Sequence, residues 1–167
     1  MNILSGNLKP NLGNFETSPS WDEILDYFHG TELKNHFQKI STNDLRVSIK
    51  PQAVYELKDI WKDDCKSLLN TIDKKSTEPK LEEINAIEEL SLENSLNKKL
   101  DELSGGDLQR LSIAIACQKD ADLYLFDEPS SYNDVYQRIA VANIIRKLSD
   151  LGKTVLLVEH DILFLII

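Results

Sequence analysis

Apolar residues recur at helical spacing in the first third of the chain. Ser20 and Glu23 have the spacing of a capping box, which predicts a helix that begins directly after Ser20. Gly30 is expected to end that helix, and apolar residues three or four positions apart predict a second helix over residues 33–40. The pattern therefore predicts a helix-loop-helix.

The middle of the chain, residues 55–102, is polar and rich in lysine and glutamate. Its leucines and isoleucines are spaced for short amphipathic helices, and they do not alternate with polar residues as they would in a strand. The residues that carry the helical pattern are Leu68, Leu69, Ile72, Leu81, Ile84, Ile87 and Leu90. We therefore expect this stretch to be helical.

The last third of the chain has the strongest pattern. Ser104 is expected to cap a helix, and a short apolar run at residues 123–126 follows that helix. A second helical pattern over residues 135–148 leads into another apolar run at residues 154–158. Two short strands joined by a helix of about four turns make a βαβ unit, whose strands are parallel. The sequence thus predicts an α/β fold with a parallel βαβ core.

Composition and charge narrow the classes of function. The 167 residues are 41% hydrophobic and 28% charged, as in a folded globular protein, and the formal charge of -9 argues against simple coating of nucleic acid. Cys65 and Cys117 are far apart with no histidine nearby, so we expect no iron-sulfur or zinc site and a reducing cytosol. Since no apolar run approaches the ~20 residues of a membrane span, we expect no membrane partner.

Candidate chemistry lies where the two predicted strands end. In a parallel sheet, ligands bind beyond the carboxyl ends of the strands, and here Asp127-Glu128 and Glu159-His160-Asp161 follow them. One carboxylate in such a place can hold Mg²⁺ while its neighbour polarises a water molecule. Ser104-Gly105-Gly106 is a candidate phosphate contact, because an anion can approach the backbone N–H groups at a glycine-rich helix start. Taken singly, these features also fit solvated charges and an ordinary helix cap.

The order and spacing of these motifs resemble those of the ATP-binding cassette (ABC) ATPases. The matching segments are Lys50-Pro51-Gln52 for the Q-loop, residues 103–110 for the signature motif, residues 123–129 for Walker B, residues 131–134 for the D-loop and His160 for the switch histidine. The resemblance implies a partial ABC nucleotide-binding domain with an α-helical signature subdomain.

Further segments resemble the first nucleotide-binding domain of the RNase L inhibitor family, the soluble E subfamily of ABC proteins, which splits ribosomes into subunits for recycling. These segments are residues 6–13, 21–33, 49–52 and 127–132. The resemblance implies a cytoplasmic ATPase module that couples ATP binding and hydrolysis to ribosomal subunit dissociation. The helix-loop-helix would then be an insert that faces the ribosome.

The resemblance also implies roles for single residues. Asp127 and Gln52 would hold Mg²⁺. Glu128 would position or activate the hydrolytic water, and His160 would contact the γ-phosphate of ATP. The implied nucleotide-binding residues are Gln52, Ser104, Gly105, Gly106 and Asp134. The signature residues among them would close over ATP held by a second nucleotide-binding domain of the same protein, so this chain would carry halves of two sites.

The implied partners are the ribosomal small subunit with its rRNA, and translation termination and initiation factors. Residues 29–50 hold four basic and two acidic side chains, against the negative balance of the whole chain, and Lys34, Lys39 and Arg46 would contact rRNA. The alternative is a solvated helix face. The aromatic residues expected to form the small core of the insert are Trp21, Tyr27, Phe28 and Phe37.

The sequence departs from the family pattern in several places. It contains no Walker A motif, because Gly152-Lys153-Thr154 lacks a glycine five residues earlier and enters a strand. We therefore expect a fragment, or a truncated gene product, of a first cassette, inactive by itself and without the family's iron-sulfur domain. Asp107 stands where the signature motif usually has Gln or Glu, and Asn133 replaces an apolar residue of the D-loop.

The leading functional hypothesis is an ATPase module of a ribosome-recycling factor. The alternatives are a non-catalytic ribosome-binding module, the ATPase cassette of an ABC transporter, and an ATPase head of the DNA-repair type, which would need long coiled-coil arms.

We expect the chain to divide into three parts. Residues 1–54 would hold the end of the Walker A helix, the insert and the Q-loop, and residues 55–120 the helical subdomain with the signature motif. Residues 121–167 would hold Walker B, the D-loop and the switch histidine.

Overall fold

The computed structural model describes residues 1–72 and 84–161. The chain divides into two compact units, Met1–Val47 and Ser48–Ile167. The strand β1 (Val47–Lys50) begins at the last residue of the first unit. The three-part division expected from the sequence stays a prediction.

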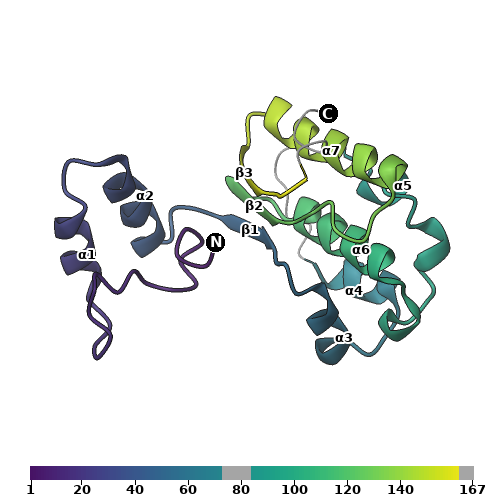
Figure 1. The fold of residues 1–167 in the computed structure, drawn as a ribbon, viewed down its shortest axis with the longest axis horizontal. Helices are drawn as coiled ribbons and strands as arrows, with labels where there is room; N and C mark the ends of the chain where they lie inside the picture. Colours follow the sequence, from purple (N-terminus) through teal and green to yellow (C-terminus); the bar gives the residue numbers. More distant parts are fainter. Residues whose placement is uncertain (73–83, 162–167) are drawn as a thin grey trace. The chain divides into compact units, whose positions relative to one another are not determined.

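The first unit contains the predicted helix-loop-helix, α1 (Trp21–Tyr27) and α2 (Glu32–Ser41) (Figure 1). The predicted capping box is formed, because the Glu23 N–H donates to Ser20 Oγ at 3.3 Å and the Ser20 N–H donates to Glu23 Oε2 at 2.7 Å. The helix α1 ends two residues earlier than expected, with Phe28 as its C-cap. Gly30 instead takes a left-handed conformation in the turn before α2.

Aromatic packing forms the core of the first unit, as predicted. Phe37 is 2% exposed, and its ring centroid lies 5.2 Å from that of Phe28 and 6.5 Å from that of Trp21. The prediction is wrong for Tyr27, which is 67% exposed. The reason is that Ile24 and Phe28, four residues apart, take the inner face of α1.

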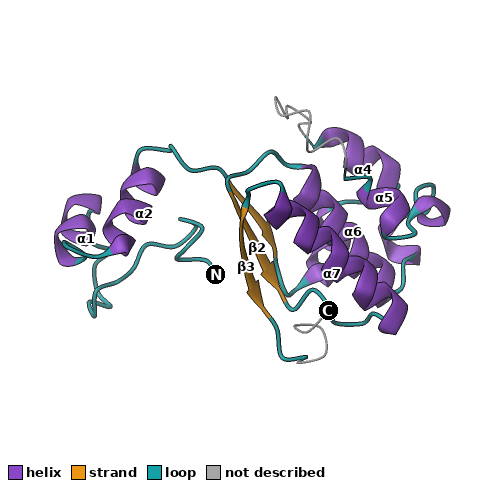
Figure 2. Cartoon of the chain, turned by 90° about the horizontal axis from the view of Figure 1, so that it is seen from above, coloured by secondary structure: helices purple, strands orange, loops and turns teal. Residues whose placement is uncertain are grey.

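The second unit is built on a three-stranded sheet with the strand order β1-β2-β3. The strands β2 (Leu123–Asp127) and β3 (Thr154–Val158) are parallel and are joined by α7 (Val135–Asp150), which confirms the βαβ unit. The helices α6 (Gly105–Gln118) and α7 lie on the same side of the sheet (Figure 2). This arrangement leaves the carboxyl ends of β2 and β3 at one shared edge.

Alternate residues of β2 and β3 face the two helices. Tyr124 and Phe126 are fully buried in the core cluster that includes α6 and α7, and Leu157 packs against the same cluster. Leu156 and Val158 point to the other side of β3 and are exposed. Since β2 is buried on both faces, the exposed face of β3 pins the register, because a shift of β3 by one residue would expose Leu157 and turn Leu156 and Val158 toward the core.

The middle of the chain forms short helices, as its pattern predicts. They are α3 (Leu57–Ile60), α4 (Cys65–Thr71) and α5 (Ala86–Glu89), with 3-10 turns at Val54–Glu56, Glu93–Ser95 and Leu100–Glu102. The helix expected over residues 81–90 is confirmed only as the single turn α5, and Leu81 lies outside the described residues. Within residues 1–72 and 84–161, no helix has both the length and the apolar character that a membrane crossing requires.

Candidate functional site

The carboxyl ends of β2 and β3 lie side by side. The parallel register pairs Asp127 with Val158, so Glu128 and Glu159 follow at the same edge of the sheet. The N–H of Glu128 donates to the carbonyl oxygen of Val158 at 2.8 Å, which ties the two strand ends together. The structure thus brings the acidic residues after both strands into one place.

Glu128 and His160, the two expected catalytic residues, are in contact. His160 Nε2 lies 2.5 Å from Glu128 Oε1, and Ser131 Oγ donates to Glu128 Oε2 at 3.5 Å. The hydrogen bond with His160 holds the pKa of Glu128 below its ordinary value, and a hydrogen bond with the Gln52 side chain adds to this effect against partial burial. Glu128 is therefore an ionised carboxylate at neutral pH, as a general base requires.

Lys50 is a site residue that the sequence analysis did not single out. It was counted with the basic residues expected to favour RNA contact, but it is fully buried at the last position of β1. Its Nζ donates to the carbonyl oxygen of Asp127 at 2.7 Å and to that of Glu128 at 3.4 Å. Burial lowers the pKa of Lys50 to about 8, although the carboxylates of Asp127, Glu128 and Glu159 oppose the shift.

We expect the substitution Lys50→Met to remove a pH-dependent part of the stability. The Lys50 pKa is about 8 in the folded protein and 10.5 as the ordinary value, so between these pH values the unfolded chain binds more protons than the folded one. The free energy of unfolding of the wild type should rise across this window by roughly 3 kcal/mol at most, relative to that of the variant. Urea unfolding of both proteins at about pH 7.5 and about pH 10 measures this difference. The same pH dependence in both proteins would contradict the prediction.

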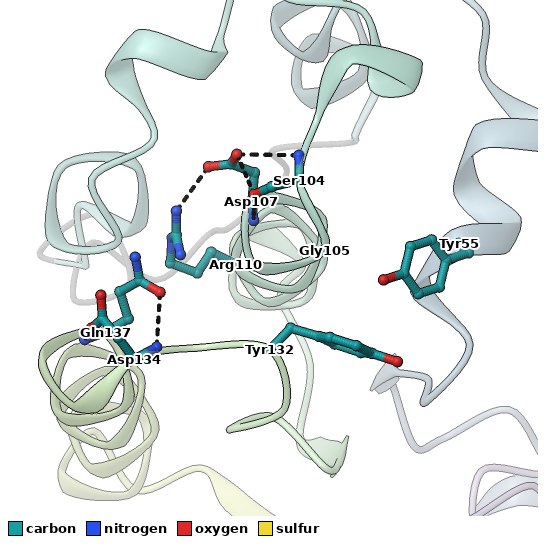
Figure 3. Close-up of a pocket in the computed structure, with 9 residues that line it drawn as sticks. Tyr55, Ser104, Gly105, Asp107, Arg110, Tyr132, Asp134 and Gln137 are labelled. Carbon is teal, nitrogen blue, oxygen red and sulfur yellow. Dashed lines mark hydrogen bonds and ion pairs between the residues drawn. The ribbon is translucent and has the colours of Figure 1, made fainter.

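The signature segment lines a pocket of about 610 Å³ (Figure 3). Its lining residues are Tyr55, Ser104, Gly105, Gly106, Asp107, Arg110, Tyr132, Asp134 and Gln137. Ser104 caps α6 as predicted, because its Oγ accepts the Asp107 N–H at 3.1 Å and donates to Asp107 Oδ2 at 2.6 Å. Asp107, although shorter than the usual Gln or Glu, thus completes a capping box.

The two glycines at the start of α6 leave no room for side chains. A Cβ on Gly106 would lie 2.8 Å from the carbonyl oxygen of Tyr132, and a Cβ on Gly105 would lie 2.6 Å from Tyr55 Oη. The rings of Tyr55 and Tyr132 meet edge to face, with centroids 5.7 Å apart. The backbone of the first turn of α6 therefore forms part of the pocket wall, as phosphate recognition by N–H groups requires.

Buried polar contacts join the signature segment to the D-loop. Arg110 Nη2 donates to Asp107 Oδ1 at 2.8 Å, and Arg110 Nη1 donates to Asn133 Oδ1 at 3.2 Å. Asn133 Nδ2 in turn donates to the carbonyl oxygen of Pro129 at 3.3 Å. Both residues that depart from the family pattern, Asp107 and Asn133, are thus engaged by Arg110. The side chain of Asp134 caps α7, where it accepts the Gln137 N–H at 2.9 Å.

The residues at the sheet edge fit a magnesium ion bound together with a nucleotide. Asp127 provides a half-buried carboxylate at the last position of β2, and the side chain of Gln52 reaches Glu128. Mg²⁺ is commonly held by one or two carboxylates, with phosphate oxygens and water as the remaining ligands. In the described ranges 1–72 and 84–161, no three His, Cys, Asp or Glu side chains gather as a metal-binding group.

The three residues expected to contact rRNA all lie in the first unit. Lys39 is exposed on α2, Lys34 is half-buried on the same helix, and Arg46 is exposed just before β1. None of them is among the residues that line the signature pocket.

The chain is similar in sequence to a known protein family and to individual proteins. The model of the family described as "ABC transporter" matches residues 1–131. Translation initiation factor RLI1 of Chaetomium thermophilum is 43% identical over 162 residues, and RLI1 of Saccharomyces cerevisiae is 44% identical over 163 residues. These alignments cover 97% of this chain but 26% and 27% of the relatives, so the chain spans about a quarter of their length.

A solved structure is similar over the same range. The archaeal ribosome recycling factor aABCE1, in its complex with the archaeal ribosomal stalk protein aP1, has a TM-score of 0.88 at 43% identity. The match covers 98% of this chain and 30% of that chain.

Proposed function

The chain belongs to the ABC transporter family of ATP-binding cassette proteins and, within it, to the RNase L inhibitor branch, and on this premise we propose that it is an ATPase module of a ribosome-recycling factor. The contact between Glu128 and His160 beyond the end of β2 carries the proposal, because it joins a low-pKa carboxylate to a residue that can bind phosphate. We place the module in the first of two nucleotide-binding domains, acting in the cytoplasm.

The proposed reaction is attack of water on the γ-phosphate of ATP. As the new P–O bond forms and the bond to the leaving ADP breaks, Glu128 takes the proton of the water and His160 donates a hydrogen bond to the γ-phosphate. Asp127 and Gln52 would hold Mg²⁺, which neutralises phosphate charge when it is bound. Lys50, at the end of β1, supports this edge of the sheet through the carbonyl oxygens of Asp127 and Glu128.

The signature pocket would serve a second ATP, held by the other nucleotide-binding domain. Two features support this part of the proposal: the two glycines at the start of α6, which have no room for a side chain, and the pair of tyrosines beside them. Without side chains at the glycines, the backbone N–H groups form the anion-binding surface of the pocket. The D-loop, through Asp134, lines the same pocket, which makes it a second element that senses that nucleotide.

The names of the similar proteins support ribosomal partners. Two relatives are called translation initiation factors, and solved neighbours include a ribosome recycling factor with a stalk protein and ABCE1 with Pelota on the ribosome. We propose that this module acts with the small ribosomal subunit and with termination and initiation factors. Lys34, Lys39 and Arg46 would face rRNA phosphates, which attract clustered basic side chains.

A chimera tests the proposed function. This chain replaces the matching segment of Saccharomyces cerevisiae RLI1, so that the relative supplies the rest of the protein. The chimera should hydrolyse ATP and separate ribosomal subunits, whereas the 167-residue chain by itself should show no saturable, Mg²⁺-dependent turnover because it has no Walker A motif. A folded chimera that co-sediments with ribosomal subunits regardless of ATP, and does not hydrolyse it, would overturn the proposal in favour of a non-catalytic binding module.

A further inference from the structure

The backbone of Glu128 is in a conformation that side-chain-bearing residues rarely adopt. Its φ is +46°, in the left-handed region. A residue stays in such a conformation only when the surrounding contacts hold it there. The contacts of the Glu128 backbone therefore decide where its carboxylate lies relative to His160.

Four hydrogen bonds hold this backbone. The Glu128 N–H donates to the Val158 carbonyl, and the Glu128 carbonyl accepts the Ser131 N–H at 3.3 Å, Gln109 Nε2 at 2.5 Å and Lys50 Nζ at 3.4 Å. Gln109 is 1% exposed and Lys50 is fully buried, so water cannot easily take the place of either donor. Of the two side-chain donors, Gln109 makes the shorter hydrogen bond.

Gln109 also belongs to the helix that lines the signature pocket. It lies four residues after Gly105, on the same face of α6 and one turn from the helix start. Backbone hydrogen bonds make one helical turn a stiff unit, so a shift of the first turn of α6 moves the Gln109 amide with it. The same amide contacts Glu128, which serves the site at the sheet edge.

We propose that Gln109 is a positioning residue that ties the carboxylate of Glu128 to the signature helix. An anion bound at the start of α6 would fix the position of this helix, and through Gln109 it would fix the backbone of Glu128. The state of one nucleotide site would thereby reach the general base of the other within a single chain. This inference rests on the proposed function, because it assigns α6 and Glu128 to different nucleotides.

The substitution Gln109→Met tests the contact, because it removes the amide donor and keeps the length of the side chain. Gln118→Met is a matched control at the last residue of α6. In each glutamine the Oε1 atom is buried and has no hydrogen-bond partner among the described residues. Of the two side chains, only that of Gln109 donates a hydrogen bond to Glu128. Both variants are made in the full 167-residue chain, without nucleotide.

The first readout is hydrogen exchange of the Glu128 amide, measured by NMR. Gln109→Met should speed this exchange about tenfold, as expected for the loss of one buried hydrogen bond, while the Leu125 amide in β2 keeps its rate. The second readout is the ring ¹⁵N signal of His160, which should move toward its value in a Glu128→Gln variant. A purely structural role would lower the melting temperature and leave the His160 signal unchanged.

Two results would overturn the proposal. One is an unchanged Glu128 exchange rate and His160 signal in Gln109→Met, and the other is an equal change of both in Gln118→Met. If Gln109→Met does not fold, Gln109→Asn decides by the same readouts, because it keeps the amide but is too short by one methylene group to reach Glu128.

The RLI1 chimera separates this inference from the proposed function. In an active chimera, Gln109→Met should lower kcat about tenfold with little change in KM, as for a group needed only in the transition state. An unchanged kcat would overturn the coupling through Gln109. A chimera that is inactive with Gln109 intact would instead count against the proposed function, and the nucleotide-free NMR readouts would still decide whether Gln109 positions Glu128.

Discussion

In the RLI1 chimera, Glu128→Gln should lower the rate of ATP hydrolysis by about 10²- to 10⁴-fold, the range that a general base contributes. The amide keeps the size of the side chain but cannot accept a proton from water. Glu128 can take that proton because its carboxylate is ionised, and the contact with His160 Nε2 holds the carboxylate in place. KM should change little, since Glu128 acts on the water rather than on ATP. Steady-state phosphate release at saturating ATP measures the loss.

Glu56→Gln is a control for the same chemical change in the same unit. Glu56 is exposed in a 3-10 turn outside the sheet edge, and its substitution should leave turnover within about twofold of the unsubstituted chimera. If Glu128→Gln lowers turnover no more than Glu56→Gln does, Glu128 is not the general base.

Phe126→Ala should destabilise the chain by about 3–5 kcal/mol. Phe126 is fully buried in the central strand and stacks on Tyr124, with centroids 6.5 Å apart and ring planes 9° apart. Truncation removes apolar contacts and leaves a cavity that the helices can fill only in part. Because small domains are stable by only about 5–15 kcal/mol, the loss should also loosen the edge that holds Asp127 and Glu128. Urea unfolding at constant pH measures the change.

Tyr136→Ala is the matched control, because it also truncates an aromatic side chain. Tyr136 is 85% exposed on α7, so its loss should change the free energy of unfolding by no more than about 0.5 kcal/mol. A similar small effect for Phe126→Ala would mean that the sheet does not pack on α6 and α7 as described.

Local patterns predicted most of the helices and two of the three strands. The capping boxes at Ser20 and Ser104 set the starts of α1 and α6, because the two hydrogen bonds of such a box depend on residues only three positions apart. The strand β1 was not predicted, since its four residues alternate too briefly to stand out from the surrounding turns. Whether such a short segment forms a strand depends on a neighbouring strand in the sheet.

In the candidate site, too, some residues were predicted from local motifs and others were found only in the tertiary structure. Glu128, His160 and Gln52 were expected from their motifs, and the structure brings their side chains together. Gln109 and Lys50 were present in the motif segments, but nothing in their spacing indicated that both donate to the Glu128 carbonyl. Their partners lie 19 and 78 residues away in the chain, beyond the reach of any local pattern.

The sequence by itself determined the α/β class, the helix caps, the order of the motifs and the absence of a Walker A motif. Each of these depends on residues that are close together in the chain, or on whether a motif occurs in the chain at all. Only the tertiary structure decided that a lysine counted as a surface charge is buried at the end of β1, and that Asn133 is bound by Arg110. Burial and long-range hydrogen bonds arise when separate elements pack, and packing depends on the shapes of both partners rather than on either segment alone.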